Sequence, residues 1–209
     1  MCWGSNGNGR LGDGLTASRA TPGYVCATGA TPPCAPSRDN ILSGVTGIAS
    51  GNGHTCAVTS NGSVKCWGSN FLGFLGDGTT IIRSTPVDVV GLSSGVVAVA
   101  VGSGFAATSH TCALTEGGGV KCWGGNFSGQ LGNATVDNSA VPVEVVGLQS
   151  GVIAVAAGGS TSCAILAQEN SVACWGSHVD GRLGDGGTCG VECTVPVFVC
   201  ASGALASML

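Results

Sequence analysis

The residues best suited to chemistry are cysteines and histidines that recur together. The chain holds 12 cysteines and 3 histidines. His54 and His110 stand two positions before Cys56 and Cys112, and imidazoles with thiolates form tetrahedral zinc sites. Thr161 replaces this histidine in the third copy, and every copy would need its own complete ligand set, which favours disulfides over zinc. Both histidines would then bind backbone groups at the starts of strands.

The cysteine spacing predicts disulfides across β-hairpins. A three-residue loop at 60–62 would place Cys56 directly opposite Cys66, and opposed residues in antiparallel strands have a separation that a disulfide can bridge. Loops at 116–118 and 167–170 do the same for the next two pairs. The predicted hairpin disulfides are Cys56–Cys66, Cys112–Cys122 and Cys163–Cys174, and closeness in sequence adds Cys26–Cys34 and Cys189–Cys193.

Three recurring aspartates could hold calcium or support turns. Asp13, Asp77 and Asp185 each follow Leu-Gly and precede Gly, and this recurrence favours side-chain caps on turn amides. Catalysis needs a nucleophile with a base, paired carboxylates or a metal cluster at one particular place, and the sequence offers none of these. We therefore predict no enzyme, with no catalytic, cofactor-binding or metal-binding residues.

These residues belong to a repeated motif that contains every tryptophan of the chain. Trp3, Trp67, Trp123 and Trp175 each lie in Cys-Trp-Gly, which continues into Gly-x-Leu-Gly. The motif recurs at intervals of roughly 50–65 residues, near the long end of propeller-blade periods. We expect these tryptophans to have a structural role, packing between blades.

The segments between motifs predict four short strands per repeat. The second repeat has apolar or β-branched runs at 85–90, 96–102, 110–114 and 120–123, separated by some of the chain's 38 glycines. Four antiparallel strands make one propeller blade. The predicted fold is all-β, with about 3.5 β-propeller blades of four antiparallel strands in this chain.

The motifs resemble the repeat of the regulator of chromosome condensation family over nearly the whole chain. The resemblance rests on Trp-Gly-x-Asn, as in Trp67 to Asn70, on Gly-x-Leu-Gly, and on a Pro-x-x-Val strand. It implies a rigid propeller, usually of about seven blades, that presents loops to protein partners. Those partners include a small GTPase, on which members act as guanine-nucleotide exchange factors, and β-lactamases, which a secreted member inhibits.

Composition narrows the partners and the compartment. The net charge is −4, and the 7 lysines and arginines are scattered, so we expect no nucleic acid partner. Apolar stretches at 96–101 and 152–157 are shorter than the ~20 residues of a spanning helix, which predicts no membrane insertion. Twelve cysteines favour an oxidising compartment. We therefore expect an extracellular or cell-surface protein-binding module, a disulfide-containing variant of bacterial or secreted type, with nucleotide exchange as a distant alternative.

The chain is expected to form one repeat domain, 1–209. The approximate repeats are 1–14 (partial), 15–78, 79–134, 135–186 and 187–209 (partial). Strand counting predicts three blades with unpaired strands at Cys2–Trp3 and Val195–Cys200, and unpaired edges tend to pair with other strands. The second hypothesis is therefore a self-assembling subunit whose open ends meet other chains in a ring or filament.

Two irregular loops interrupt the repeats and are expected to contact a protein partner. They are Thr28–Asn40 and Thr188–Cys193. Loops that vary while their scaffold stays constant commonly carry binding residues.

Overall fold

The computed structural model describes residues 1–32, 34, 40–104, 108–187 and 189–200, and these residues form an all-β fold. A short 3-10 helix, η1 (Val179–Gly181), accompanies the strands. None of the described segments forms a helix long and apolar enough to cross a membrane. The strands are β1 (Cys2–Gly4), β2 (Arg19–Gly23), β3 (Val45–Ser50), β4 (His54–Thr59), β5 (Val64–Gly68), β6 (Arg83–Asp88), β7 (Val96–Val101), β8 (His110–Thr115), β9 (Val120–Gly124), β10 (Ser139–Glu144), β11 (Val152–Gly158), β12 (Thr161–Leu166), β13 (Val172–Ser177) and β14 (Glu192–Phe198).

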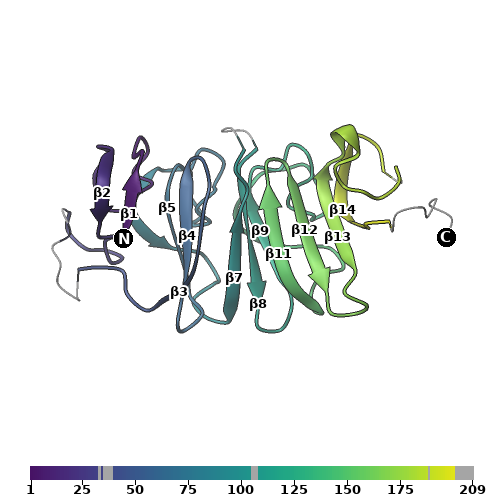
Figure 1. Ribbon diagram of the computed structural model, residues 1–209, viewed down its shortest axis with the longest axis horizontal. Helices are drawn as coiled ribbons and strands as arrows, with labels where there is room; N and C mark the ends of the chain where they lie inside the picture. The colour runs from purple at the N-terminus through teal and green to yellow at the C-terminus, as the bar shows by residue number, and fades with distance from the viewer. Residues whose placement is uncertain (33, 35–39, 105–107, 188, 201–209) are drawn as a thin grey trace.

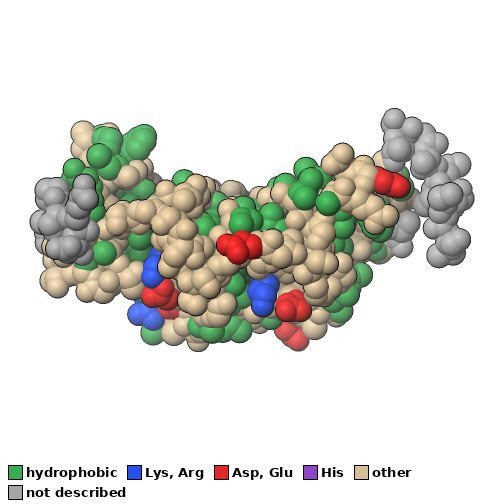
Figure 2. Space-filling model, turned by 90° about the horizontal axis from the view of Figure 1, so that it is seen from below, with side chains coloured by type: hydrophobic (Ala, Val, Ile, Leu, Met, Phe, Trp, Pro, Cys, Tyr) green, Lys and Arg blue, Asp and Glu red, His purple; other side chains and the backbone are tan. Residues whose placement is uncertain are grey.

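The strands form one two-stranded and three four-stranded antiparallel sheets. Their orders are β1-β2, β3-β4-β5-β6, β7-β8-β9-β10 and β11-β12-β13-β14. The sheets follow one another along the long axis, with β1-β2 at one end of the row and the sheet that contains β14 at the other (Figure 1). Figure 2 shows the resulting open arc, hollowed along one side. This arrangement confirms the predicted 3.5 blades.

The predicted unpaired strand at Val195–Cys200 is wrong. Residues 195–198 of this segment lie in β14, which pairs with β13 through Cys174 and Val197. Each Pro-containing strand joins the sheet of the preceding Cys-Trp-Gly strand, so sheets are offset from sequence repeats by one strand. The predicted unpaired strand at Cys2–Trp3 is also wrong, because β1 pairs with β2 and Cys2 faces Gly23. These two strands form the incomplete blade.

The predicted hairpin registers are confirmed. Cys56 faces Cys66 across β4 and β5, and the loop glycine Gly62 has a φ of +75°. This left-handed conformation suits glycine because it has no Cβ to clash with the backbone. The second hairpin places Cys112 opposite Cys122 in the same way. The hairpin loops therefore fix which cysteines meet.

The apolar core lies between neighbouring sheets as well as within them. One buried cluster combines Val58 and Val64 of the first full sheet with Val101 and Trp123 of the second. A second cluster, around Trp175, joins the second full sheet to the third. Each blade is consequently stabilised by its neighbours.

Candidate functional site

Four connectors link each Cys-Trp-Gly strand to the next strand of its sheet. They span residues 5–18, 69–82, 125–138 and 178–191, and each carries Gly-x-Leu-Gly. Because β1, β5, β9 and β13 are equivalent strands, all four connectors leave the same end of their sheets. We call this end the connector end.

A buried asparagine organises each of the first three connectors. Asn70 Nδ2 donates to Asp77 Oδ1 at 3.0 Å, while Asn70 Oδ1 accepts from Leu75 N at 2.9 Å. Asp77 Oδ1 also accepts from Thr79 N at 3.0 Å, and Asp77 pairs with Arg83. Burial raises the pKa of Asp77, but hydrogen bonds from Thr79, Asn70 and Arg83 outweigh it and lower the pKa overall.

The predicted turn role of the aspartates is confirmed. Asp13 Oδ1 accepts from Leu15 N at 3.1 Å, and Asp185 Oδ1 accepts from Gly187 N at 3.3 Å. These carboxylates cap turn amides, as Asx turns do.

A repeated contact, the interblade joint, links each tryptophan to the preceding connector. The tryptophan Nε1–H donates to the carbonyl of the variable residue in Gly-x-Leu-Gly. The pairs are Trp67 with Arg10 (2.9 Å), Trp123 with Phe74 (2.9 Å) and Trp175 with Gln130 (2.8 Å). A Cβ on Gly76, whose φ is +69°, would lie 2.8 Å from Trp123 Nε1, so the motif needs glycine there. These three tryptophans thus lie between neighbouring blades in the structure.

Each of the first two full blades contributes a buried histidine to the joint that it forms with the following blade. His54 Nε2 lies 2.8 Å from Thr111 Oγ1, and that hydroxyl donates to Phe74 O at 3.1 Å. His54 Nε2 must therefore carry the hydrogen and donate it. His110 Nε2 contacts Ser162 Oγ at 2.7 Å in the same way. The expectation that His54 binds a strand-start backbone group is thus wrong, because its partner is a side chain of the next blade.

Complete burial keeps both histidines neutral. Burial lowers the pKa of His54 to about 3, assisted by the charge that His110 would carry. Burial also lowers the pKa of His110 to about 4, against the opposing effect of the Thr108 carbonyl. These imidazoles act as fixed hydrogen-bond donors.

All five predicted cysteine pairs are joined in the structure. The Cα–Cα separation is 4.1 Å in each hairpin pair, 5.4 Å for Cys26–Cys34 and 5.9 Å for Cys189–Cys193. Cys2 and Cys200 are free cysteines. Because Cys56 is bonded to Cys66, no thiolate accompanies His54 in this state. The oxidation state of these pairs in the isolated protein stays a prediction.

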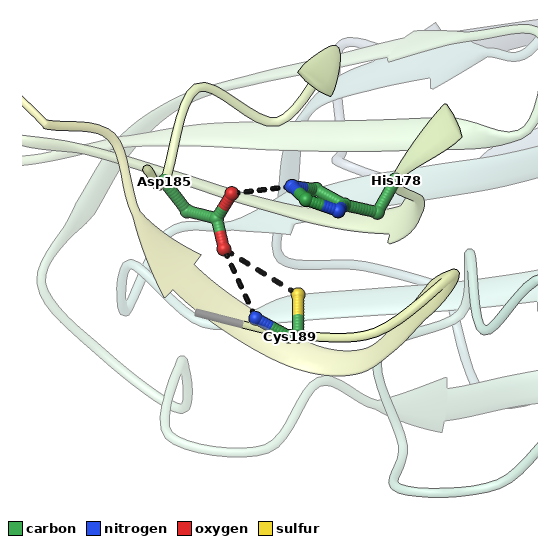
Figure 3. Close-up of side chains that lie close together, drawn as sticks. All are labelled: His178, Asp185 and Cys189. Carbon is green, nitrogen blue, oxygen red and sulfur yellow. Dashed lines mark hydrogen bonds and ion pairs between the residues drawn. The ribbon is translucent and has the colours of Figure 1, made fainter. Parts of the chain in front are cut away.

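The fourth connector departs from the others. His178 stands where the other connectors have asparagine, and its Nε2 lies 2.6 Å from Asp185 Oδ1. Cys189 Sγ lies 3.5 Å from Asp185 Oδ2 (Figure 3). This group was not predicted from the sequence, although an alignment of the four connectors would show that His178 is unusual among them.

The connector end exposes a row of large apolar side chains. Phe71, Phe127 and Val179 follow the organising Asn or His directly, and their exposed fractions are 57%, 53% and 46%. Phe71 also borders a hollow of about 330 Å³ that Arg10 lines. Arg10 Nε is buried without a hydrogen-bond partner among the described residues. The connector end thus combines apolar surface with an unused donor.

The two loops expected to bind a partner do not share one end of the molecule. Thr28–Asn40 follows β2, while Thr188–Cys193 lies at the junction of the fourth connector with β14. Since β2 and β14 are equivalent strands, these loops lie at opposite ends of their sheets. Residues 33, 35–39 and 188 of the two loops lie outside the described residues.

Four-stranded blades connected by a tryptophan joint define a β-propeller repeat protein. Models described as the Regulator of chromosome condensation (RCC1) repeat match residues 2–58 and 118–165, and residues 45–73 and 96–130. The chain belongs to this family.

Relatives agree with this assignment. Human "Probable E3 ubiquitin-protein ligase HERC3" is 31% identical over 93% of this chain and 17% of its own length. The Arabidopsis thaliana "RCC1 domain-containing protein RUG3, mitochondrial" is 32% identical over 94% of this chain and 42% of its own. The human WBSCR16 structure aligns with a TM-score of 0.71 and 24% identity over 94% of this chain and 46% of that one. The chain thus spans less than half of each of these proteins.

Proposed function

We propose that this chain is a non-catalytic protein-binding module, extracellular or on a cell surface, that engages its partner through the connector end. The observation that carries this proposal is the row Phe71, Phe127 and Val179, exposed at matching positions of three consecutive connectors. A soluble domain gains nothing for its own stability from exposing phenylalanines, and aromatic side chains supply much of the binding energy at protein interfaces.

The hollow beside Phe71 suggests the chemistry of the partner. Arg10 lines this space together with Phe71 and Phe74, and its Nε is buried without a hydrogen-bond partner among the described residues. An apolar side chain next to a carbonyl or carboxylate would satisfy both features. We therefore expect the partner to insert such a pair between the first two connectors.

Two further observations support the proposal. Structural neighbours include a complex titled "Crystal structure of Kap60 bound to yeast RCC1 (Prp20)", which aligns with a TM-score of 0.63 and 21% identity over 77% of this chain and 38% of that one. A protein that shares this fold thus binds another protein. The cysteine pairs support an oxidising location.

Cross-linking tests the binding role. We expect partners cross-linked from cell-surface and culture-medium proteins to map onto residues 69–82 and 125–138. The double variant Phe71→Ser, Phe127→Ser should weaken binding by about 30-fold or more, since one hot-spot aromatic contributes about 2 kcal/mol.

The matched control is Val97→Ser, Ile153→Ser, which removes two equally exposed apolar side chains from β7 and β11. This control should bind as the wild type does. Equal losses in both double variants, or cross-links that avoid the connectors, would show that the connector end is not the binding surface.

A second candidate function, self-assembly, is favoured by two complementary half-joints. Trp3 is 60% exposed, whereas the other three tryptophans are fully buried in joints. The fourth Gly-x-Leu-Gly, residues 181–184, packs against no tryptophan among the described residues, and Gly184 is exposed. Trp3 also borders a hollow of about 350 Å³ with Met1 and Ile48. Trp3 of one copy could therefore donate to Arg182 O of another.

Sedimentation tests self-assembly. We expect the wild-type mass to rise with concentration in the micromolar range, because pairing the half-joints removes apolar surface from water at about 25 cal/mol per Å². Trp3→Ala should remain monomeric, while Phe127→Ser should assemble normally. A wild-type monomer with a concentration-independent melt would rule this candidate out.

A further inference from the structure

The fourth connector collects metal-binding groups that the other connectors lack. His178 Nε2, a carboxylate oxygen of Asp185 and Cys189 Sγ lie within 4.8 Å of one another. Figure 3 shows the imidazole and the sulfur both facing the Asp185 carboxylate. Cys193 is four residues further on, buried, and bonded to Cys189 in the structure. Three potential ligands therefore lie together, and a fourth, Cys193 of β14, is bonded to one of them.

Two of the other connectors hold an aspartate–arginine pair where the fourth connector holds this group. In the first two connectors, Asp13 pairs with Arg19 and Asp77 pairs with Arg83, each six residues on. The residue six positions after Asp185 is Val191. The fourth connector thus exchanges the arginine for an apolar residue and gains imidazole and sulfur instead.

The charge of Asp185 makes this exchange significant. Asp185 is 1% exposed, and a buried carboxylate is stable only when hydrogen bonds and an opposite charge compensate its desolvation. Arginine supplies that charge in the first two connectors, whereas in the fourth His178 Nε2 faces the carboxylate at 2.6 Å, so a metal ion bound by both groups would place its charge at the same point. Histidine nitrogen, cysteine thiolate and carboxylate oxygen are the ligands of protein-bound zinc.

We propose that His178, Asp185, Cys189 and Cys193 bind one Zn²⁺ when the two cysteines are thiols. The spacing of Cys189 and Cys193 lies within the range of paired zinc-binding cysteines. The zinc-bound and disulfide states exclude each other, because sulfurs bonded together cannot act as thiolate ligands. This site is independent of the protein-binding role of Phe71 and Phe127.

Conversion between the two states can be written with a phosphine as reductant. The phosphorus gives two electrons to the Cys189–Cys193 disulfide and takes the oxygen of a water molecule, becoming a phosphine oxide. The two hydrogens of that water end on the sulfurs, giving two thiols. Zn²⁺ then displaces the thiol protons into solvent.

Cobalt spectroscopy tests the site, because Co²⁺ adopts zinc geometry and reports its ligands by absorption. The experiment uses the full chain with Cys2→Ser and Cys200→Ser, which removes the two free cysteines. The protein is treated with a water-soluble phosphine without denaturant, freed of it anaerobically and mapped by alkylation. We expect Cys189 and Cys193 to be alkylated, and the buried pairs Cys56–Cys66 and Cys112–Cys122 to stay protected.

Titration of this reduced protein should give intense visible bands of tetrahedral Co²⁺ and a thiolate charge-transfer band, both saturating at one ion per chain. An equivalent of Zn²⁺ should abolish both. The untreated protein should show neither, because its sulfurs are bonded.

Two variants separate this site from adventitious binding. His178→Asn restores the residue of the other connectors, so this variant should keep the fold. Its affinity for Co²⁺ should fall by more than the roughly 10–100-fold that loss of an outer-sphere partner costs. Cys189→Ser, Cys193→Ser should abolish the bands.

Three outcomes would overturn the proposal. They are unchanged bands in either variant, octahedral Co²⁺ in the reduced protein, and a Cys189–Cys193 pair that resists reduction until the protein unfolds.

Discussion

Acidification from about pH 8 to about pH 5 will reduce the free energy of unfolding by about 4 kcal/mol, through His54 and His110 alone. Their pKa values are about 3 and about 4 in the folded protein, against 6.5 for a histidine free of these surroundings. At about pH 5 these two imidazoles are therefore protonated in the unfolded chain but remain neutral in the folded protein. The contribution of these histidines to the free energy of unfolding is fully present above their pKa in the unfolded chain. It falls as the pH drops below that value and levels off only near the pKa values of the folded protein.

Urea denaturation at a series of pH values measures this effect. The double variant His54→Gln, His110→Gln keeps a side-chain N–H donor at both positions but cannot be protonated. The double variant leaves His178 unchanged. We expect its free energy of unfolding to change little over the same pH range. A pH dependence that survives in the double variant would assign the proton uptake to other groups.

Trp123→Ala will destabilise the protein by about 3–5 kcal/mol, the usual cost of removing a large buried aromatic side chain. Trp123 is fully buried in the core cluster with Leu75 and Val89, and its loss leaves Phe74 O without its indole donor. Trp3→Ala should cost less than about 0.5 kcal/mol in the monomer, because Trp3 is mostly exposed.

Equilibrium denaturation at low protein concentration measures the loss in free energy of unfolding for each of the two variants, Trp123→Ala and Trp3→Ala. The two tryptophans share the same sequence context, so their difference isolates the contribution of the joint. Similar losses in the two variants would mean that the motif stabilises its own strand rather than the contact between blades.

Local features of this fold could be predicted from the sequence because they depend on short-range geometry. The loop at 60–62 fixes how β4 meets β5, and with it the opposition of Cys56 and Cys66. Periodic Cys-Trp-Gly motifs likewise revealed the blades. The assignment of strands to sheets was less accessible, since β14 joins β13 only after a connector whose path the sequence pattern does not specify.

Long-range partners within the site also escaped prediction. The hydroxyl that accepts from His54 belongs to Thr111, in another blade, and no local pattern links the two residues. The His178 group could have been found by aligning the connectors, because both His178 and Val191 differ there from their counterparts. Its closeness to Cys189 needed the folded turn.

The interblade joint has a direction: the donor always belongs to the later blade and the acceptor to the earlier one. Each joint involves only adjacent blades, so copying or removing a whole blade leaves every remaining joint chemically unchanged. Blade number can therefore change by gene duplication or in-frame loss without redesign of any contact. The same polarity makes every such contact between two copies head-to-tail, so a two-fold symmetric pair needs two of these joints, one at each end of each copy.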